Sequence, residues 1–243
     1  MGGLFYNLGK LAGPKIRKAK WAYLAATAPK DEVIEAESIV GDDMACAVRK
    51  QFECCRSLEK VDLLRSIGSA LGRCLKNNRR RYSFECIHSV EPQAFCLPGG
   101  FIFVSDSLID LCEQGADQIA FVLAHEMAHV IEGHVMERML SHSLIKAVMR
   151  AGHLRAATTG SLGQVGIRFL ERAYSQENEL RADTMGVRLA VAAGYNPAAM
   201  IDLFLRLEPL QKDDLLSQYF STHPSCQRRI ENIRRLRRNT SDS

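Results

Sequence analysis

One stretch of this sequence decides the fold: Val122-Leu123-Ala124-His125-Glu126-Met127-Ala128-His129-Val130. Apolar residues stand on every side of its three polar ones, which predicts a helix that is buried all round rather than along one stripe. Residues four apart on an α-helix lie about 40° apart around the axis and about 6 Å apart along it. The two histidines, His125 and His129, therefore share one face of a buried helix.

A histidine, a glutamate, any two residues and a second histidine make up the HExxH pattern, which is typical of zinc-dependent hydrolases. Both imidazoles can reach one Zn²⁺ at about 2.0–2.1 Å, while Glu126 is rotated out of coordination and can take a proton from metal-bound water. The alternative is an amphipathic helix with two histidines at its surface. We favour the metal site, with one Zn²⁺ per chain, because buried polar side chains need a partner.

A second acidic motif lies downstream, Glu179-Leu180-Arg181-Ala182-Asp183. A catalytic zinc site needs a third protein ligand and an open position for water. Glu179 can supply that ligand, and Asp183, one helical turn on, can accept the outer N–H of a ligating histidine. Glu177 is the rival ligand, but it lies about 200° around the helix from Glu179 and has no carboxylate four residues further on. Alone, the motif would indicate a solvent-exposed acidic face; beside HExxH, we expect Glu179 to bind the metal.

His134 follows His129 by five residues, which is about 140° around a helix. Metzincins place their third histidine ligand one residue later, after a glycine turn. We therefore predict that His134 has a structural role and does not bind the metal.

The rest of the chain predicts a mainly helical α+β fold with a small sheet. Residues 82–88 alternate between apolar and polar side chains and predict a strand, and residues 101–104 predict a second one after Pro98-Gly99-Gly100. Either strand could present an edge to which an extended peptide adds. We expect two helices or one broken helix within 31–77, with the break at Gly41-Asp42-Asp43. Single helices are expected over 106–112, 117–139, 164–193, 197–207 and 225–238.

Residues 141–163 contain three glycines and are predicted to form a loose connection, which could cover the cleft. Residues 1–34 form a basic segment, with no acidic residue among the first 30. A solvated helix face explains this charge, and the alternatives are contact with a membrane surface or a targeting segment. We place one domain over residues 35–238, followed by a disordered tail at 239–243.

The composition is that of a globular protein large enough for one substantial core, with 47% hydrophobic and 25% charged residues among 243. A net charge of +4 is too small to indicate nucleic-acid binding. No run reaches the roughly 18 apolar residues of a membrane span. The eight cysteines have irregular spacing and no Cys-x-x-Cys pair, which favours reduced thiols. We expect a cytoplasmic protein that can lie against a membrane.

Four motifs together resemble the gluzincin metallopeptidase family of the CAAX prenyl endoprotease, HtpX and the Oma-type mitochondrial peptidases. Residues 93–100, Gln-Ala-Phe-Cys-Leu-Pro-Gly-Gly, resemble its edge-strand signature, with glutamine in place of the first asparagine. Residues 122–130 resemble its active-site helix, and residues 179–183 resemble its ExxAD helix. Thr222-His223-Pro224, with Arg229-Ile230 further on, resembles its late HP…RI motif. The resemblance covers roughly residues 35–236.

This resemblance implies a zincin-like fold in which the small sheet lies beside the HExxH helix. It also implies a zinc-dependent endopeptidase that hydrolyses peptide bonds with metal-activated water and Glu126 as general base. The substrate would be a peptide or an unfolded protein. The members named above carry membrane spans and this sequence shows none, so their roles in membranes do not transfer.

The resemblance also assigns individual residues. Glu179 would be the third metal ligand, and His223, with Arg229, would support the transition state. Ala94 and Phe95 would lie on the edge strand along which the substrate binds.

Three alternatives stay open. A deformylase-like amidase also uses HExxH, with a cysteine ligand such as Cys96 or Cys112. A peptide-binding or chaperone-like module could keep the fold with little proteolysis, although an intact Glu126 argues against it. A purely structural zinc site usually closes with four cysteine or histidine ligands. Neither the cleavage specificity nor the oligomeric state follows from the sequence.

Overall fold

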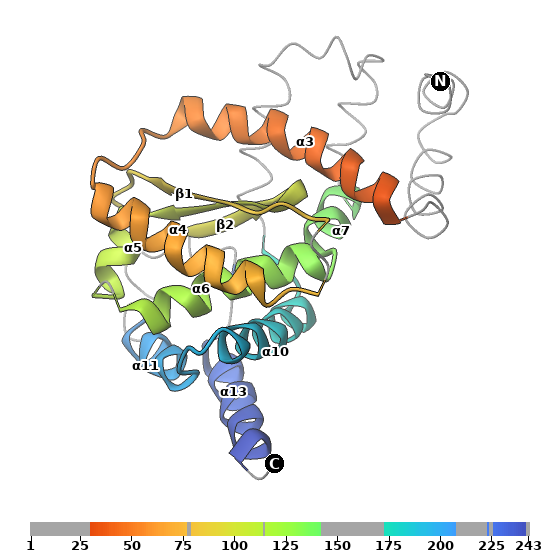
Figure 1. Cartoon of the computed structure of the whole chain (residues 1–243). Helices are drawn as coiled ribbons and strands as arrows, with labels where there is room; N and C mark the ends of the chain where they lie inside the picture. The colour runs from red at the N-terminus through yellow and green to blue at the C-terminus, as the bar shows by residue number, and fades with distance from the viewer. Residues whose placement is uncertain are drawn as a thin grey trace.

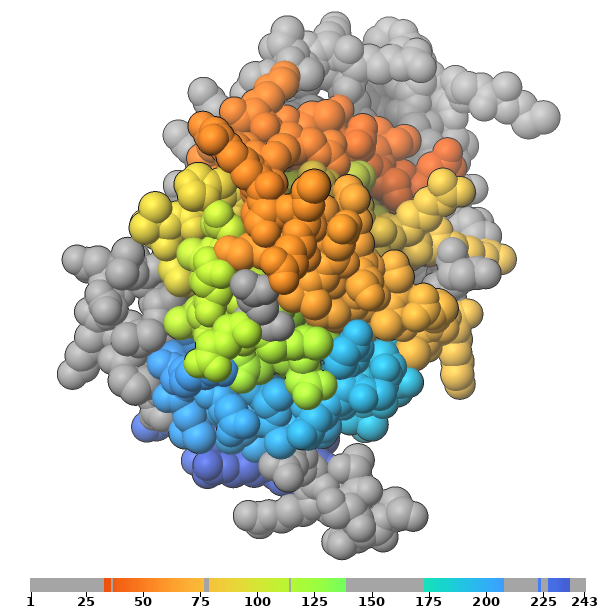
Figure 2. All heavy atoms as spheres, turned by 60° about the vertical axis from the view of Figure 1, so that its left-hand side comes forward, coloured from red at the N-terminus to blue at the C-terminus, as the bar shows by residue number. Residues whose placement is uncertain are grey.

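The computed structural model describes residues 30–76, 79–113, 115–141, 173–207, 223 and 226–241. These residues form a mainly helical α+β fold around one small sheet, as predicted (Figure 1). In the space-filling view, helix α4 lies between α3 above it and α10 and α11 below (Figure 2). No helix in this part of the chain is long and apolar enough to cross a membrane. The basic segment up to residue 29 and the connection at 142–163 lie outside the described residues.

The sheet has three strands, β1 (Ser83–Ile87), β2 (Ala94–Leu97) and β3 (Phe101–Ser105), in the order β1-β3-β2. Strand β3 is parallel to β1 and antiparallel to β2. The two strands predicted from the sequence pattern are confirmed, but the idea that 101–104 could present an edge is wrong, because β3 is central. Strand β2 is too short for periodicity to indicate it. Only the resemblance pointed to it.

Helix α3 (Lys30–Gln51) covers one face of the sheet and is continuous through Gly41. The predicted break at Gly41-Asp42-Asp43 is therefore wrong. A Cβ at Gly41 would lie 1.8 Å from the carbonyl oxygen of Pro98, so the glycine lets α3 pack directly on the turn between β2 and β3. The domain boundary predicted after residue 34 falls inside this helix.

Helix α4 (Leu58–Arg73) is the second helix predicted within 31–77. Ser57 caps the N-terminus of this helix, because its hydroxyl accepts a hydrogen bond from the N–H of Lys60. Its apolar face, with Leu64, Ile67 and Leu71, packs against β1 and α6.

Three helices follow the sheet: α5 (Asp106–Leu111), α6 (Ala116–Ile131) and α7 (His134–Ser141). The single helix predicted over 117–139 is wrong at one point, because α6 ends at Glu132 and Gly133 adopts a φ of +76°. The chain turns there before α7 begins. Helix α6 lies between the sheet and α10, and its residues 118–130 are all buried.

Helices α10 (Gln176–Ala192), α11 (Ala198–Leu207) and α13 (Cys226–Ser241) complete the described chain. The helix predicted to begin at Gln164 begins later, because residues 173–175 are not helical and the hydroxyl of Ser175 caps α10. Helix α13 continues three residues beyond the predicted end at 238, so residues 239–241 are helical rather than a tail.

The seven cysteines whose side chains are described are free thiols, in agreement with their irregular spacing: Cys46, Cys54, Cys55, Cys74, Cys86, Cys96 and Cys112.

Candidate metal centre

Helix α6 carries two histidines and a glutamate into the protein interior. His125, Glu126 and His129 are only 4%, 2% and 0% exposed. Their helical spacing brings Nε2 of His125 to 3.1 Å from Nε2 of His129. The two imidazoles therefore converge from one face of the helix, as the sequence predicts.

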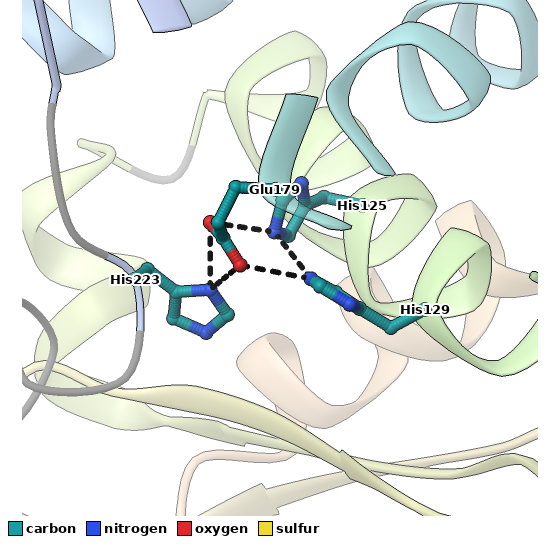
Figure 3. Close-up of side chains that lie close together, drawn as sticks. All are labelled: His125, His129, Glu179 and His223. Carbon is teal, nitrogen blue, oxygen red and sulfur yellow. Dashed lines mark hydrogen bonds and ion pairs between the residues drawn. The ribbon is translucent and has the colours of Figure 1, made fainter. Parts of the chain in front are cut away.

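Helix α10 brings Glu179 against these two nitrogens (Figure 3). Its Oε1 lies 3.2 Å from Nε2 of His129, and its Oε2 lies 3.6 Å from Nε2 of His125. Glu177, the rival ligand, is exposed. The structure therefore places Glu179, rather than Glu177, beside the two histidines.

The close approach of α10 to α6 depends on Gly186. A Cβ at this position would lie 3.1 Å from the backbone nitrogen of His125 and 3.2 Å from its Cα. These distances are shorter than ordinary van der Waals contacts. A residue without a side chain thus lets α10 pack on the backbone of α6, two turns beyond Glu179.

The outer nitrogen of His125 faces a carboxylate. Nδ1 of His125 lies 2.9 Å from Oδ1 of Asp183, which is fully buried one turn after Glu179. A carboxylate in this position accepts the Nδ1–H, so the lone pair of His125 is on Nε2, the nitrogen that points towards Glu179.

The outer nitrogen of His129 faces another histidine. Nδ1 of His129 lies 3.1 Å from Nδ1 of His134, whose side chain is buried at the start of α7. The turn at Gly133 makes this contact possible, because a continuous helix would carry His134 about 140° away from His129. His134 is thus placed behind His129 rather than among the converging ligand atoms.

Tyr174 packs against the imidazole of His129. Its ring stacks on the imidazole of His129 with centroids 3.7 Å apart, and the guanidinium of Arg138 lies 4.1 Å from the centre of the same ring. The hydroxyl of Tyr174 is 3.7 Å from the sulfur of Cys96 on β2. Tyr174 therefore links the edge strand to the metal-site histidine.

The converging atoms fit a zinc ion. Ligand atoms at about 2.0–2.1 Å from a tetrahedral zinc lie about 3.3–3.4 Å from one another. The observed separations among the His125, His129 and Glu179 atoms are 3.1, 3.2 and 3.6 Å. In addition, with the proton of each imidazole on Nδ1, the lone pairs of the two Nε2 atoms would face the same point, which is unfavourable unless a positive charge lies between them. The donor set itself therefore indicates a cation.

His223 is the fourth residue of the cluster, and it is 1% exposed. Its Nδ1 lies 3.1 and 3.2 Å from the two oxygens of Glu179, and its Nε2 lies 3.4 Å from Oε1 of Glu126. Burial opposes a charge on His223, but the carboxylates of Glu179 and Glu126 outweigh it and raise the pKa of His223. The imidazole thus lies between the ligand and the proposed base.

Glu126 is a buried carboxylate beside these imidazoles. Burial raises its pKa, but the imidazoles of His223, His125 and His129 outweigh that effect and lower it, so the carboxylate is ionised at neutral pH. Its Oε2 accepts no hydrogen bond from the described residues. One oxygen is therefore available to water or substrate.

Arg229 on α13 lies behind the ligands. Its Nε and Nη2 donate to the two oxygens of Asp183 at 2.9 and 2.7 Å, and its Nη1 is 3.2 Å from Oε2 of Glu179. Burial opposes ionisation of Glu179, but His223 and Arg229 hold its pKa well below the usual range. Arg229 thus holds two carboxylates, and its Nη2 also lies 3.4 Å from Nε2 of His125, so it contacts two of the converging residues directly.

Strand β2 contains the two residues expected along the substrate. Ala94 and Phe95 are both buried, and the ring of Phe95 stacks on that of Phe103 at 5.3 Å. No cysteine belongs to the cluster of ligand atoms in the described residues, so Cys96 and Cys112 give no support to a cysteine-ligated amidase.

The sequence motifs give no sign of two contacts in this centre, the stacking of Tyr174 on His129 and the approach of His134 to His129. Tyr174 precedes α10 and gives no periodic signal, and the role of His134 depends on a turn that the helical pattern hides. A glycine four residues after His129 was the one available sign of that turn.

Two helices cross at a glycine and place two histidines and a glutamate around one point, with a second glutamate beside it, and this arrangement is typical of metallopeptidases. Comparison with known proteins identifies the family. The profile of peptidase family M48 matches residues 61–237, and the chain belongs to this family.

Several curated proteins are similar to the chain. The mitochondrial metalloendopeptidase OMA1 of Schizosaccharomyces pombe is 30% identical over 170 residues, which cover 67% of this chain and 50% of that protein. The metalloprotease LoiP of Escherichia coli is 27% identical over 181 residues, covering 72% of this chain and 70% of LoiP. The β-barrel assembly-enhancing protease of Escherichia coli is 25% identical over 185 residues, covering 70% of this chain and 37% of that protein. The chain spans half or less of the length of the OMA1 proteins of the two yeasts and Arabidopsis thaliana.

Proposed function

We propose that this chain is a zinc-dependent endopeptidase that cleaves peptides or unfolded proteins. The observation that carries the proposal is the convergence of His125, His129 and Glu179 beside a buried, ionised Glu126. His125 and His129 would hold the zinc through Nε2, and Glu179 through its carboxylate. When bound, zinc would polarise the peptide carbonyl and acidify a water molecule.

Glu126 would move the protons. Its free oxygen would take a proton from the attacking water while the water oxygen bonds to the carbonyl carbon. The same carboxyl would then give that proton to the amide nitrogen as the carbon–nitrogen bond breaks. The products are a carboxylic acid and an amine, which after proton exchange are a carboxylate and an ammonium group, and Glu126 ends ionised, as it began.

His223 and Arg229 would support this step in different ways. His223 lies within 3.4 Å of Glu126 and carries a raised pKa, so it can donate a hydrogen bond to the negative oxygen that develops on the carbonyl. Arg229 contacts Asp183 and Glu179 and would act by fixing their positions. We therefore propose that Arg229 positions these two carboxylates and does not itself support the transition state.

The substrate would lie along β2. Among the described residues this strand pairs with β3 on one side only, so its other side can accept an extended peptide through backbone hydrogen bonds. Such pairing recognises the backbone of residues such as Ala94 and Phe95 and depends little on substrate sequence. A cytoplasmic location and contact with a membrane surface remain part of the proposal.

The alternative is a peptide-binding or chaperone-like module with little proteolysis. The two functions differ in their need for Glu126, because a binder has no use for a buried, ionised base. The test measures zinc per chain and cleavage of casein by the wild type and by Glu126→Gln. We expect about one zinc in each, and turnover lower by roughly 10²–10⁴-fold in the variant. Wild-type protein that holds zinc and leaves casein intact would favour the binder.

A further inference from the structure

A groove with a volume of about 640 Å³ runs along the edge of the sheet opposite to β2. One wall is the stripe Arg65, Gly68, Ser69 and Gly72 on α4, and the other is residues 83–85 of β1. Because residues three and four apart share a helix face, the stripe is continuous and about 10 Å long. That length matches about three residues of an extended chain.

The backbone of β1 offers unpaired groups to this groove. On the outer side of β1, the carbonyl of Cys86 accepts from the N–H of Cys55 at 3.0 Å, and the N–H of His88 donates to the carbonyl of Glu53 at 2.7 Å. Backbone groups of alternate residues point to the same side of a strand, so those of Phe84 point outward too. Within the described part of the chain, they have no backbone partner there. An added strand could pair with them.

Arginines give the groove an excess of positive charge. Arg49 donates to both oxygens of Glu85 at 2.9 and 2.7 Å, and Arg80 forms an ion pair with Glu37. The third, Arg65, is exposed and has no acidic partner among the described residues. Glu85 is the one acidic residue of the lining, against three arginines. A ligand with carboxylates would therefore bind better than one with ammonium groups.

Aromatic rings complete the lining. Tyr82 and Phe84 have stacked rings with centroids 6.5 Å apart, and Leu75 closes the end of the α4 wall. A strand that adds to β1 presents alternate side chains to the two sides. The ring of Phe84 lies against Gly68 of α4 and so shares the side of Arg65, whereas Arg49 and Glu85 face the other side. Acidic side chains on either side of the added strand would therefore meet an arginine, and apolar ones beside Arg65 would fit the rings.

We propose that this groove binds an extended acidic segment of a polypeptide substrate as an additional strand on β1. The proposal rests on the endopeptidase function proposed above. Strands β1 and β2 are separated only by β3, so their axes lie about 10 Å apart. An unfolded chain held on β1 would therefore stay close to the cleft on β2, which raises its effective concentration there.

The test uses the full chain with zinc and Glu126→Gln, so that peptides bind and are not cut. A fluorescent peptide of alternating glutamate and valine is compared with one of alternating lysine and valine, by anisotropy. We expect the acidic peptide to bind more tightly, and Arg65→Glu to weaken it by about tenfold. Gly72→Phe should also abolish tight binding, because no heavy atom lies within 4 Å of a Cβ at this position and the ring can enter the groove.

Two matched variants control for charge and size. Arg188→Glu makes the same charge change at an exposed position of α10, and Ser66→Phe adds the same ring at an exposed position of α4 outside the groove. Made in the Glu126→Gln background, both variants should bind the acidic peptide with the same affinity as Glu126→Gln alone. Equal binding of the two peptides, unchanged binding in both groove variants, or equal loss in the controls would overturn the proposal.

Cleavage separates this proposal from the proposed function. With Glu126 restored, a peptide too short to reach from β2 to the groove should be cut at the same rate by the wild type, Arg65→Glu and Gly72→Phe. If nothing is cut by the wild type while binding follows the expected pattern, the groove stands as a peptide site and the endopeptidase function fails.

Discussion

The Nδ1 atoms of His129 and His134 lie 3.1 Å apart in the protein interior. Burial lowers the pKa of His129 to about 3 and also lowers the pKa of His134, so both are neutral at pH 7. A neutral His129 with its proton on Nδ1 donates to His134 and directs the lone pair of Nε2 towards Glu179. We therefore expect His134 to select the tautomer of His129 that can bind a metal.

Replacing His134 separates this hydrogen bond from simple packing. His134→Phe fills the space but cannot accept from His129, so we expect zinc affinity to fall by about 10–100-fold, as is usual when the hydrogen-bond partner of a ligand is lost. His134→Gln keeps an acceptor oxygen and should lose less. Competition with a chelating dye measures both affinities. Equal affinities in the two variants would reduce His134 to a packing role.

The register of α10 predicts opposite effects at two glutamates. Glu179→Gln removes a carboxylate that lies 3.2 Å from Nε2 of His129, and should weaken zinc binding strongly. Glu177 is exposed, so Glu177→Gln should leave both zinc content and turnover near the wild-type values. Metal analysis after dialysis distinguishes them. A sensitive Glu177 would mean that the helix is rotated from the position described above.

Gly186 should connect helix packing to metal affinity. In Gly186→Ala the new methyl would lie 3.1 Å from the backbone nitrogen of His125, so α10 must move away from α6 and carry Glu179 with it. We expect weaker zinc binding and a loss of about 1–3 kcal/mol of stability from overpacking. Gly72→Ala is the control, because its methyl meets no atom within 4 Å and should stabilise α4 by about 0.5–1 kcal/mol. Chemical denaturation and zinc titration of both variants provide the comparison.

The local part of this site was predictable from the sequence. The positions of His125 and His129 on one helix face, and of Glu179 and Asp183 on another, follow from the 3.6-residue period alone. Both helices formed as that period requires. The helical period fails at Gly133, where one residue with a φ of +76° ends α6. The pattern of apolar residues continues into α7, so this pattern does not indicate this end of the helix.

Glycines inside helices were harder to interpret. At Gly41 the sequence indicated a break, since glycine and two aspartates favour turns, but α3 continues because the glycine packs on Pro98. Contacts between distant segments, such as Tyr174 on His129, leave no periodic signal at all. These features depend on tertiary packing, which outweighs local preference.

Removing the metal should destabilise the fold. Zinc would bind the folded arrangement of His125, His129 and Glu179 and not the unfolded chain, so free zinc at 100 times its Kd adds about 2.7 kcal/mol of stability. A chelator should therefore lower the Tm of the wild type. His125→Ala and His129→Ala, which lack a ligand, should start at the lower Tm and respond little. A wild-type Tm that does not change with chelator would count against a bound metal.

The geometry of His223 allows two roles, a hydrogen-bond donor to the transition state or a fourth metal ligand. It belongs to the four-residue cluster that could hold a metal, yet its Nδ1 faces Glu179 and its Nε2 faces Glu126 at 3.4 Å. Both contacts suit a hydrogen-bond donor to the transition state. A fourth protein ligand, in contrast, would occupy the position that a catalytic zinc keeps for water.

Metal content and turnover together decide between these roles. As a donor, His223 should affect catalysis and not binding, so His223→Ala should keep about one zinc per chain while kcat falls by roughly 10–10³-fold, the scale of one lost oxyanion donor. The exposed His88 supplies the control, since His88→Ala should change neither quantity. Unchanged cleavage in His223→Ala would mean that His223 has only a structural role before α13. Loss of zinc would instead make it a ligand, and the arrangement described here would be a latent state in which the imidazole takes the place of water.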